Sequence, residues 1–150
     1  MNEDLFTLRR GSTPLLISLP HVGTTLPAEL GGRLVDRAAA AEDTDWHLER
    51  LYAFAVELGA SMLVPRLSRY AIDLNRPPGD APMYPGVNNT ELCPTRFFTG
   101  EPLYRDGMTP DEAEVRQRPG HQDTQRGRHQ DCLHRHRPPP HLAGQRCHPS

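Results

Sequence analysis

Residues 14–23, Pro-Leu-Leu-Ile-Ser-Leu-Pro-His-Val-Gly, decide the fold class. A short apolar run between two prolines predicts a buried strand, in a sheet that is covered on both faces. His21 then begins a loop at the carboxyl end of that strand. Ligand sites in open α/β sheets lie beyond the carboxyl ends of their strands, so His21 is the first candidate functional residue. Taken alone, a histidine at such a place is more often a surface or hydrogen-bonded side chain.

The residues that follow predict a helix and two more strands. Asp43, Thr44 and Asp45 are all suitable amino-terminal caps, and apolar residues follow at helical spacing, so a helix is expected to begin at Asp43. Gly59 stands where such a helix would stop. Residues 61–64 and 70–72 predict the two strands. Strand, helix and strand in this order indicate an α/β layer fold.

The chain changes character near residue 118. Residues 77–110 are rich in proline and glycine and predict an extended surface segment, after which Thr109, Pro110 and Glu112 predict the start of a helix that runs to Arg118. Residues 119–150 hold none of the nine aromatic residues and only five hydrophobic ones. Such a tail buries too little apolar surface to offset the entropy of ordering it. The predicted domain therefore spans residues 1–118, and residues 119–150 are expected to be disordered, out-of-frame or foreign sequence.

Composition excludes several classes of protein. Residues 1–118 carry twelve arginines against seventeen acidic residues, a net charge of −5, and the remainder carries +3 without aromatic side chains. This distribution argues against a nucleic-acid partner. The cysteines are three in number and form no Cys-x-x-Cys pair, so neither a disulfide framework nor a cysteine zinc site is indicated. The amino terminus lacks the apolar run of a signal peptide, and no later stretch is long enough to span a bilayer. A cytoplasmic protein without a membrane partner is expected.

Two further groups of polar residues are candidates for a site. Asp43 and Asp45 form a carboxylate pair, although acidic residues at a helix start also cap its free amides, and spacing alone does not decide between the two roles. Arg69, Asn75 and Arg76 flank the predicted strand at residues 70–72. Two guanidinium forks near one strand end suit a substrate with two carboxylates. On spacing alone, the alternative of a turn with solvated arginines is favoured.

Several segments together resemble one known family. These are Ser18-Leu19-Pro20-His21-Val22-Gly23, Asp43-Thr44-Asp45-Trp46-His47 and the block from Ser68-Arg69 to Asp73-Leu74-Asn75-Arg76, in this order. They resemble the N-formylglutamate amidohydrolase family, which is related to zinc carboxypeptidases and aspartoacylases. The segments 83–86, 92–94 and 98–104 look like the deformylases of histidine breakdown in particular. The resemblance runs from about Leu15 to Arg118, and the ordered set is far more specific than any one block.

The resemblance implies a fold, a reaction and a metal site. The fold would be a three-layer mixed-sheet zinc-hydrolase fold of the carboxypeptidase kind, truncated in this chain. The reaction would be hydrolysis of N-formyl-L-glutamate to formate and L-glutamate in histidine degradation, with one zinc ion and a small N-acyl amino acid as substrate. His21 would be the first zinc ligand, and Asp45, in preference to Asp43, would be the second. Zinc with three protein ligands activates water at neutral pH, which suits this reaction.

The same resemblance assigns the arginines and shows what is missing. Arg69 would polarise the amide oxygen or grip a carboxylate, and Asn75 with Arg76 would bind the α-carboxylate. The family's third ligand, a histidine in a His-Ser-type motif, and its general-base glutamate are not recognisable in this sequence. The sequence therefore predicts a member of an enzyme family that is truncated and inactive in this copy. Two alternatives remain: a non-catalytic fragment that binds carboxylates, and a binding module whose His/Arg-rich tail holds metal ions or nucleic acid.

Overall fold

The computed structural model describes residues 5–77 and 89–118. In chain order the elements are β1 Phe6–Arg9, β2 Leu16–Ser18, α1 Ala28–Gly31, η1 Asp36–Ala40, α2 Leu48–Leu51, α3 Ala53–Glu57, β3 Ser61–Pro65, η2 Arg105–Gly107 and α4 Glu112–Gln117. The central strand of the three-stranded sheet is β3, which pairs antiparallel with β1 and parallel with β2. The protein is therefore mixed α/β, with a small mixed sheet.

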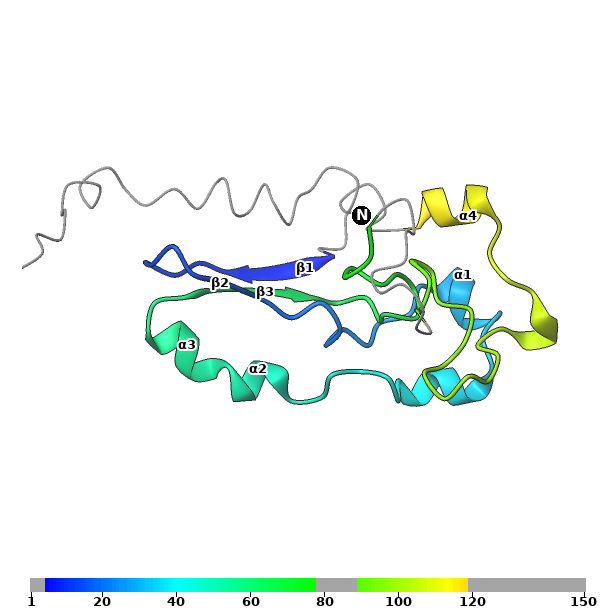
Figure 1. The fold of residues 1–150 in the computed structure, drawn as a ribbon, viewed down its shortest axis with the longest axis horizontal. Coiled ribbons are helices and arrows are strands. Elements are labelled where there is room, and N and C mark those ends of the chain that lie inside the picture. Colours follow the sequence, from blue (N-terminus) through cyan, green and yellow to red (C-terminus); the bar gives the residue numbers. More distant parts are fainter. Residues whose placement is uncertain (1–4, 78–88, 119–150) are drawn as a thin grey trace, which may run out of the picture.

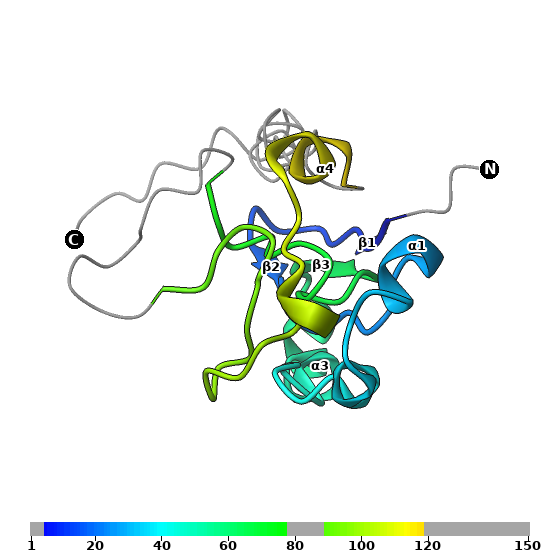
Figure 2. The same cartoon turned by 90° about the vertical axis from the view of Figure 1, so that its right-hand side faces the viewer.

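Helices α2 and α3 run along one face of this sheet (Figure 1). Met62 and Val64 of β3 pack with Leu19 into a small core, and α2 and α3 add Leu48 and Val56 to it. Turned by 90°, the molecule shows α4 on the side of the sheet opposite α3 (Figure 2), and Figure 1 shows that α4 lies beyond the ends of the strands and not over them. Within the described residues, helices thus cover one face of the sheet, and the second helical layer of a three-layer fold is not seen there.

The larger core lies past the carboxyl ends of β2 and β3. It combines side chains from α1, η1, the segment after β3 and the segment 92–104, and its fully buried members include Leu30, Leu34, Ile72, Leu92 and Leu103. Three stretches that are far apart in the chain, residues 30–38, 67–72 and 92–104, therefore pack at the edge where the strands end. This packing fixes the loops in which the candidate site residues stand.

Strands β2 and β3 were predicted with unequal accuracy. The strand expected between Pro14 and Pro20 is shorter, spans only Leu16–Ser18 and is half-buried, with Leu15 55% exposed. The prediction of a fully buried strand was wrong because, among the described strands, β2 pairs with β3 alone and lies at the sheet edge. The strand predicted at residues 61–64 is confirmed as β3, all of whose residues are buried. Strand β1 was not predicted.

The helix expected to begin at Asp43 begins five residues later. The backbone amide of Asp45 donates to the carbonyl oxygen of His21 at 3.0 Å, and His47 has a left-handed backbone with φ 67°. The long-range hydrogen bond to His21 and the left-handed backbone of His47 hold residues 43–47 as turns and override the local capping preference. Helix α2 then starts at Leu48, and Gly59, with φ 86°, follows α3 at the predicted stop.

The strand predicted at residues 70–72 is a buried turn. The side chain of Ser68 accepts from the amide of Tyr70 at 3.2 Å, and its carbonyl oxygen accepts from the amide of Ala71 at 2.9 Å. An apolar run of three residues fits a buried turn as well as a strand, and a serine that caps the turn decides between them.

Helix α4 begins two residues after the predicted start. Its cap is Asp111, which forms a capping box with Glu114, instead of Thr109 with Glu112. Both pairs fit the capping pattern, but Glu114 also forms an ion pair with Arg33 of a distant segment. This contact favours the pair of Asp111 and Glu114. The predicted end near Arg118 is confirmed. The segment 83–86 and the tail 119–150 lie outside the described residues. No helix in the described ranges is long and apolar enough to cross a membrane.

Candidate active site

The loop after β2 holds His21 against the end of β3. The amide of Thr25 donates to the carbonyl oxygen of Arg66 at 2.9 Å, so the two chains remain paired beyond the strands. Gly23 makes this approach feasible, because a Cβ at residue 23 would lie 2.2 Å from the carbonyl oxygen of Leu67. The glycine therefore positions the histidine two residues before it.

His21 lies between two carboxylates. Its Nε2 donates to Asp73 Oδ1 at 2.7 Å, and its Nδ1 lies 3.5 Å from Asp45 Oδ2. Asp73 is fully buried, whereas Asp45 is partly exposed. A proton on Nε2 leaves the lone pair of Nδ1 facing Asp45 in the neutral ring. The structure thus brings His21 and Asp45 together, as expected for two ligands of one ion.

Asp73 is the centre of the polar cluster. Besides His21, it accepts from Arg69 Nη2 at 2.8 Å and from the backbone amide of Asn75 at 2.9 Å, and Arg76 Nε lies 3.7 Å from its Oδ2. Burial alone would raise the pKa of Asp73, but the hydrogen bond from His21 and the charge of Arg69 outweigh it and hold the pKa below its usual value. The carboxylate is therefore ionised at neutral pH and binds all these groups.

The three residues predicted to bind substrate differ in their surroundings. Arg69 is buried on Asp73. Arg76 donates through Nη2 to the hydroxyl of Thr90 at 2.9 Å, while its buried Nε has no hydrogen-bond partner within the described part of the chain. Asn75 has an exposed side chain. Both arginines thus meet His21 at Asp73, and the buried Nε of Arg76 faces Asp73 Oδ2 at 3.7 Å.

Asp43 is held apart from His21 by other contacts. Its Oδ2 accepts from the amide of Phe98 at 3.1 Å, and its own amide donates to the hydroxyl of Tyr70 at 3.1 Å. Burial raises the pKa of Tyr70 to about 12, so this hydroxyl stays protonated. The geometry thus gives Asp43 a structural role and leaves Asp45 facing the histidine.

Asp73 is the site residue to which the sequence analysis assigned no role. It stands within the quoted block, four residues after Arg69 and three before Arg76. A carboxylate between two arginines in such a block was the available signal, because a buried carboxylate needs cations close by. The predicted strand at residues 70–72 obscured this signal.

The donor atoms at His21 suit two corners of a metal site. No group of three or more His, Cys, Asp or Glu side chains that could hold a metal ion occurs in residues 5–77 and 89–118. The 3.5 Å between His21 Nδ1 and Asp45 Oδ2 is close to the ~3.4 Å between two ligand atoms of a tetrahedral zinc ion. A carboxylate on the other ring nitrogen, here that of Asp73, is the usual partner of a metal-ligating histidine.

A surface cavity of about 290 Å³ lies along β1 and the loop after β2. Its lining includes Thr7, Arg9, Glu49 and Arg66, but none of the predicted site residues. The buried ionic cluster at Asp73, and not this open cavity, is therefore the candidate for chemistry.

Comparison with known proteins shows the family of this chain. A model of the N-formylglutamate amidohydrolase family matches residues 13–123. An N-formylglutamate deformylase of Pseudomonas aeruginosa is 51% identical over 116 residues, 77% of this chain and 43% of that protein. One of Pseudomonas putida is 44% identical over 108 residues, 72% of this chain and 40% of that protein.

A solved structure is also similar to this chain. The N-formylglutamate amidohydrolase from Ralstonia eutropha JMP134 superimposes with a TM-score of 0.64 at 25% identity, over 87% of this chain and 49% of that one. The chain thus spans less than half the length of the curated relatives and about half of the solved structure. Since the family model matches well over half of the chain, and both curated relatives carry the same name, this chain belongs to the N-formylglutamate amidohydrolase family.

Proposed function

We propose that the described residues form part of a site that hydrolyses N-formyl-L-glutamate to formate and L-glutamate, a step of histidine degradation. The observation that carries this proposal is His21 held between Asp45 and Asp73, with Arg69 and Arg76 on the same buried carboxylate. The names of the curated relatives support the choice of substrate.

In this proposal His21 and Asp45 hold a zinc ion. When bound, zinc supplies a Lewis acid that lowers the pKa of water to about 7 and polarises a carbonyl group. Asp73 keeps the proton of His21 on Nε2, so that Nδ1 presents its lone pair on the side of Asp45.

The arginines recognise the substrate. N-formyl-L-glutamate carries two carboxylates and one amide, so it needs cationic donors on more than one side. Arg69 stabilises the negative charge that develops on the amide oxygen, because its guanidinium is fixed by Asp73 before the substrate arrives. Arg76, held beside Asp73, binds the α-carboxylate together with Asn75.

A second candidate is a carboxylate-binding protein without turnover. It is favoured because no group of three or more His, Cys, Asp or Glu side chains that could hold a metal ion occurs among the described residues. Two donors hold zinc more weakly than three, whereas the arginines bind anions without a metal. The two candidates therefore differ in formate release and agree in substrate binding.

A chimaeric protein separates them. Residues 1–118 are joined to the part of the Pseudomonas aeruginosa deformylase that this chain does not match, and formate release from N-formyl-L-glutamate is measured with and without zinc. We expect zinc-dependent release that Asp45→Asn abolishes. Asp36→Asn is the matched control, because Asp36 is 94% exposed and pairs with Arg105 instead of His21. Equal loss in both variants would remove Asp45 from the site, and substrate binding without release would favour the second candidate.

A further inference from the structure

An aromatic ring lies against the guanidinium of Arg69. The Cζ atom of Arg69 is 4.2 Å from the centroid of the Phe98 ring, and its Nη2 donates to Asp73 at 2.8 Å. The guanidinium of Arg69 thus contacts both the ring of Phe98 and the carboxylate of Asp73. Phe98 is nevertheless 55% exposed, so its burial in a core does not explain its position.

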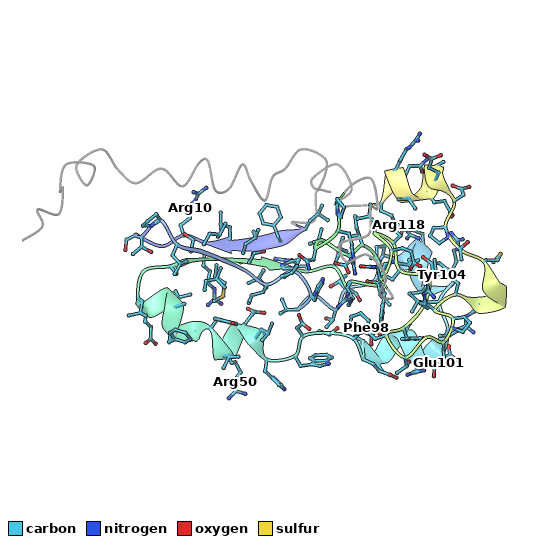
Figure 3. The ribbon with its side chains drawn as sticks, viewed as in Figure 1. Arg10, Arg50, Phe98, Glu101, Tyr104 and Arg118 are labelled. Atoms are coloured by element: carbon cyan, nitrogen blue, oxygen red, sulfur yellow. The ribbon has the colours of Figure 1, made fainter. Side chains whose placement is uncertain are left out.

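A small hairpin places Phe98 there. Arg96 and Pro102 form an antiparallel bridge, and the amide of Phe97 donates to the carbonyl oxygen of Glu101 at 3.0 Å. Gly100, with φ 99°, closes the turn in a conformation that favours glycine. In Figure 3, Phe98 lies toward the middle of the view and Glu101 lies farther to the right. The hairpin therefore holds Phe98 where its ring contacts the guanidinium of Arg69.

Phe97 anchors this hairpin in the core. Its ring is almost fully buried and meets Tyr70 edge to face at 5.4 Å, while the guanidinium of Arg37 covers it at 4.5 Å. The consecutive residues Arg69 and Tyr70 thus contact the consecutive residues Phe98 and Phe97. Since the second contact is buried, it sets the register of the first.

The backbone of Phe98 is held as well. Its amide donates to Asp43 Oδ2 at 3.1 Å, and the amide of Asp43 donates to Tyr70. Arg37 adds an ion pair to Glu101 at 3.4 Å on the outer side of the hairpin. These contacts hold the Phe98 ring in place without using its own exposed surface.

We propose that Phe98 is a positioning residue for Arg69: its ring covers one face of the guanidinium and fixes the plane in which the remaining N–H groups meet the substrate. This inference rests on the role of Arg69 in the proposed function. Cations over an aromatic face are attracted by its quadrupole, and a guanidinium stacks flat on it. With Asp73 on one edge and the ring on one face, Arg69 retains a single orientation toward an anionic group.

Nuclear magnetic resonance on the full 150-residue chain tests the geometry directly. The Nε–Hε resonance of Arg69, assigned by its disappearance in Arg69→Lys, should be shifted by the ring current of Phe98. Phe98→Leu should return it to the ordinary arginine position, and Phe98→Tyr should keep the shift. Phe54→Leu is the matched control, because Phe54 is also 55% exposed and lies on α3.

A titration with N-formyl-L-glutamate tests the consequence. Phe98→Leu should weaken binding about 2- to 10-fold, Phe98→Tyr should restore it, and Phe54→Leu should leave it unchanged. A purely structural role would be filled by leucine as well as by tyrosine, so equal behaviour of the two Phe98 variants would overturn the proposal. An Arg69 resonance that Phe98→Leu does not move would overturn it too. The ring-current result is independent of formate release, so failure of the proposed reaction is seen separately.

Discussion

Replacement of Asp73 by asparagine tests whether one buried carboxylate holds the histidine and the arginines together. Asp73 Oδ1 accepts from His21 and from the amide of Asn75, and Oδ2 accepts from Arg69. An asparagine whose oxygen keeps the first two bonds must place its NH₂ group where Oδ2 now lies. That group then meets Arg69 Nη2, donor against donor, at a distance that is now 2.8 Å.

The expected cost follows from these contacts. One charge-assisted hydrogen bond, worth about 1.5–3 kcal/mol, is lost. Arg69 stays buried without its counter-ion, and breaking a buried pair costs about 3–5 kcal/mol in total. Native proteins are stable by only about 5–15 kcal/mol, so Asp73→Asn should remove a large part of the free energy of unfolding.

Urea denaturation followed by circular dichroism measures this loss. The midpoint should fall while the slope stays unchanged, which shows that stability and not compactness has altered. The control is Asp36→Asn, which breaks a surface ion pair and should cost no more than about 1 kcal/mol. The reasoning is refuted if both variants lose the same stability. Zinc affinity of the folded variant, measured by chelator competition, should also fall about 10- to 100-fold.

Gly23→Ala should destabilise the fold by about 1–3 kcal/mol or more, because the new Cβ lies 2.2 Å from a backbone oxygen. Thermal denaturation should show no such loss for Gly31→Ala, whose new Cβ has no atom within 4 Å. Glu114→Gln should lower stability mainly above pH 4.5. The hydrogen bond from Arg33 holds the pKa of Glu114 below its usual value, so this stabilisation is complete above the unfolded pKa near 4.5 and is lost as the pH falls through the lower folded pKa. An unfolding difference between wild type and variant that is equal at neutral pH and at about pH 3 would contradict this. The 150-residue chain alone, incubated with zinc and N-formyl-L-glutamate, should release no formate, because the described residues offer two metal donors where hydrolytic zinc sites have three. Zinc-dependent release would mean that residues outside 5–77 and 89–118 complete the site.

The order of the polar blocks could be recognised from the sequence alone. The histidine after an apolar strand, the Asp-Thr-Asp turn and the Arg-to-Arg block stand close to one another because parallel pairing brings the ends of β2 and β3 to one edge. Strand β3 was equally predictable, since residues 61–64 are mostly apolar and stand between Gly59 and Pro65. In the structure all residues of β3 are buried. Membership of the family, too, rests on residues that sequence comparison alone detects.

The roles within those blocks depended on contacts between distant residues. The local capping pattern predicted that a helix begins at Asp43. In the structure its carboxylate instead accepts a hydrogen bond from the amide of Phe98, 55 residues away. Because the carboxylate of Asp43 binds that amide, Asp45 is the member of the pair that faces His21. Chain order and the apolar runs of β2 and β3 were enough to predict which side chains gather at the strand ends, although β1 was not predicted. That Asp73 is the centre of the cluster follows from the tertiary structure alone. A buried carboxylate pairs with the cations that packing places beside it, and local sequence does not show which these are.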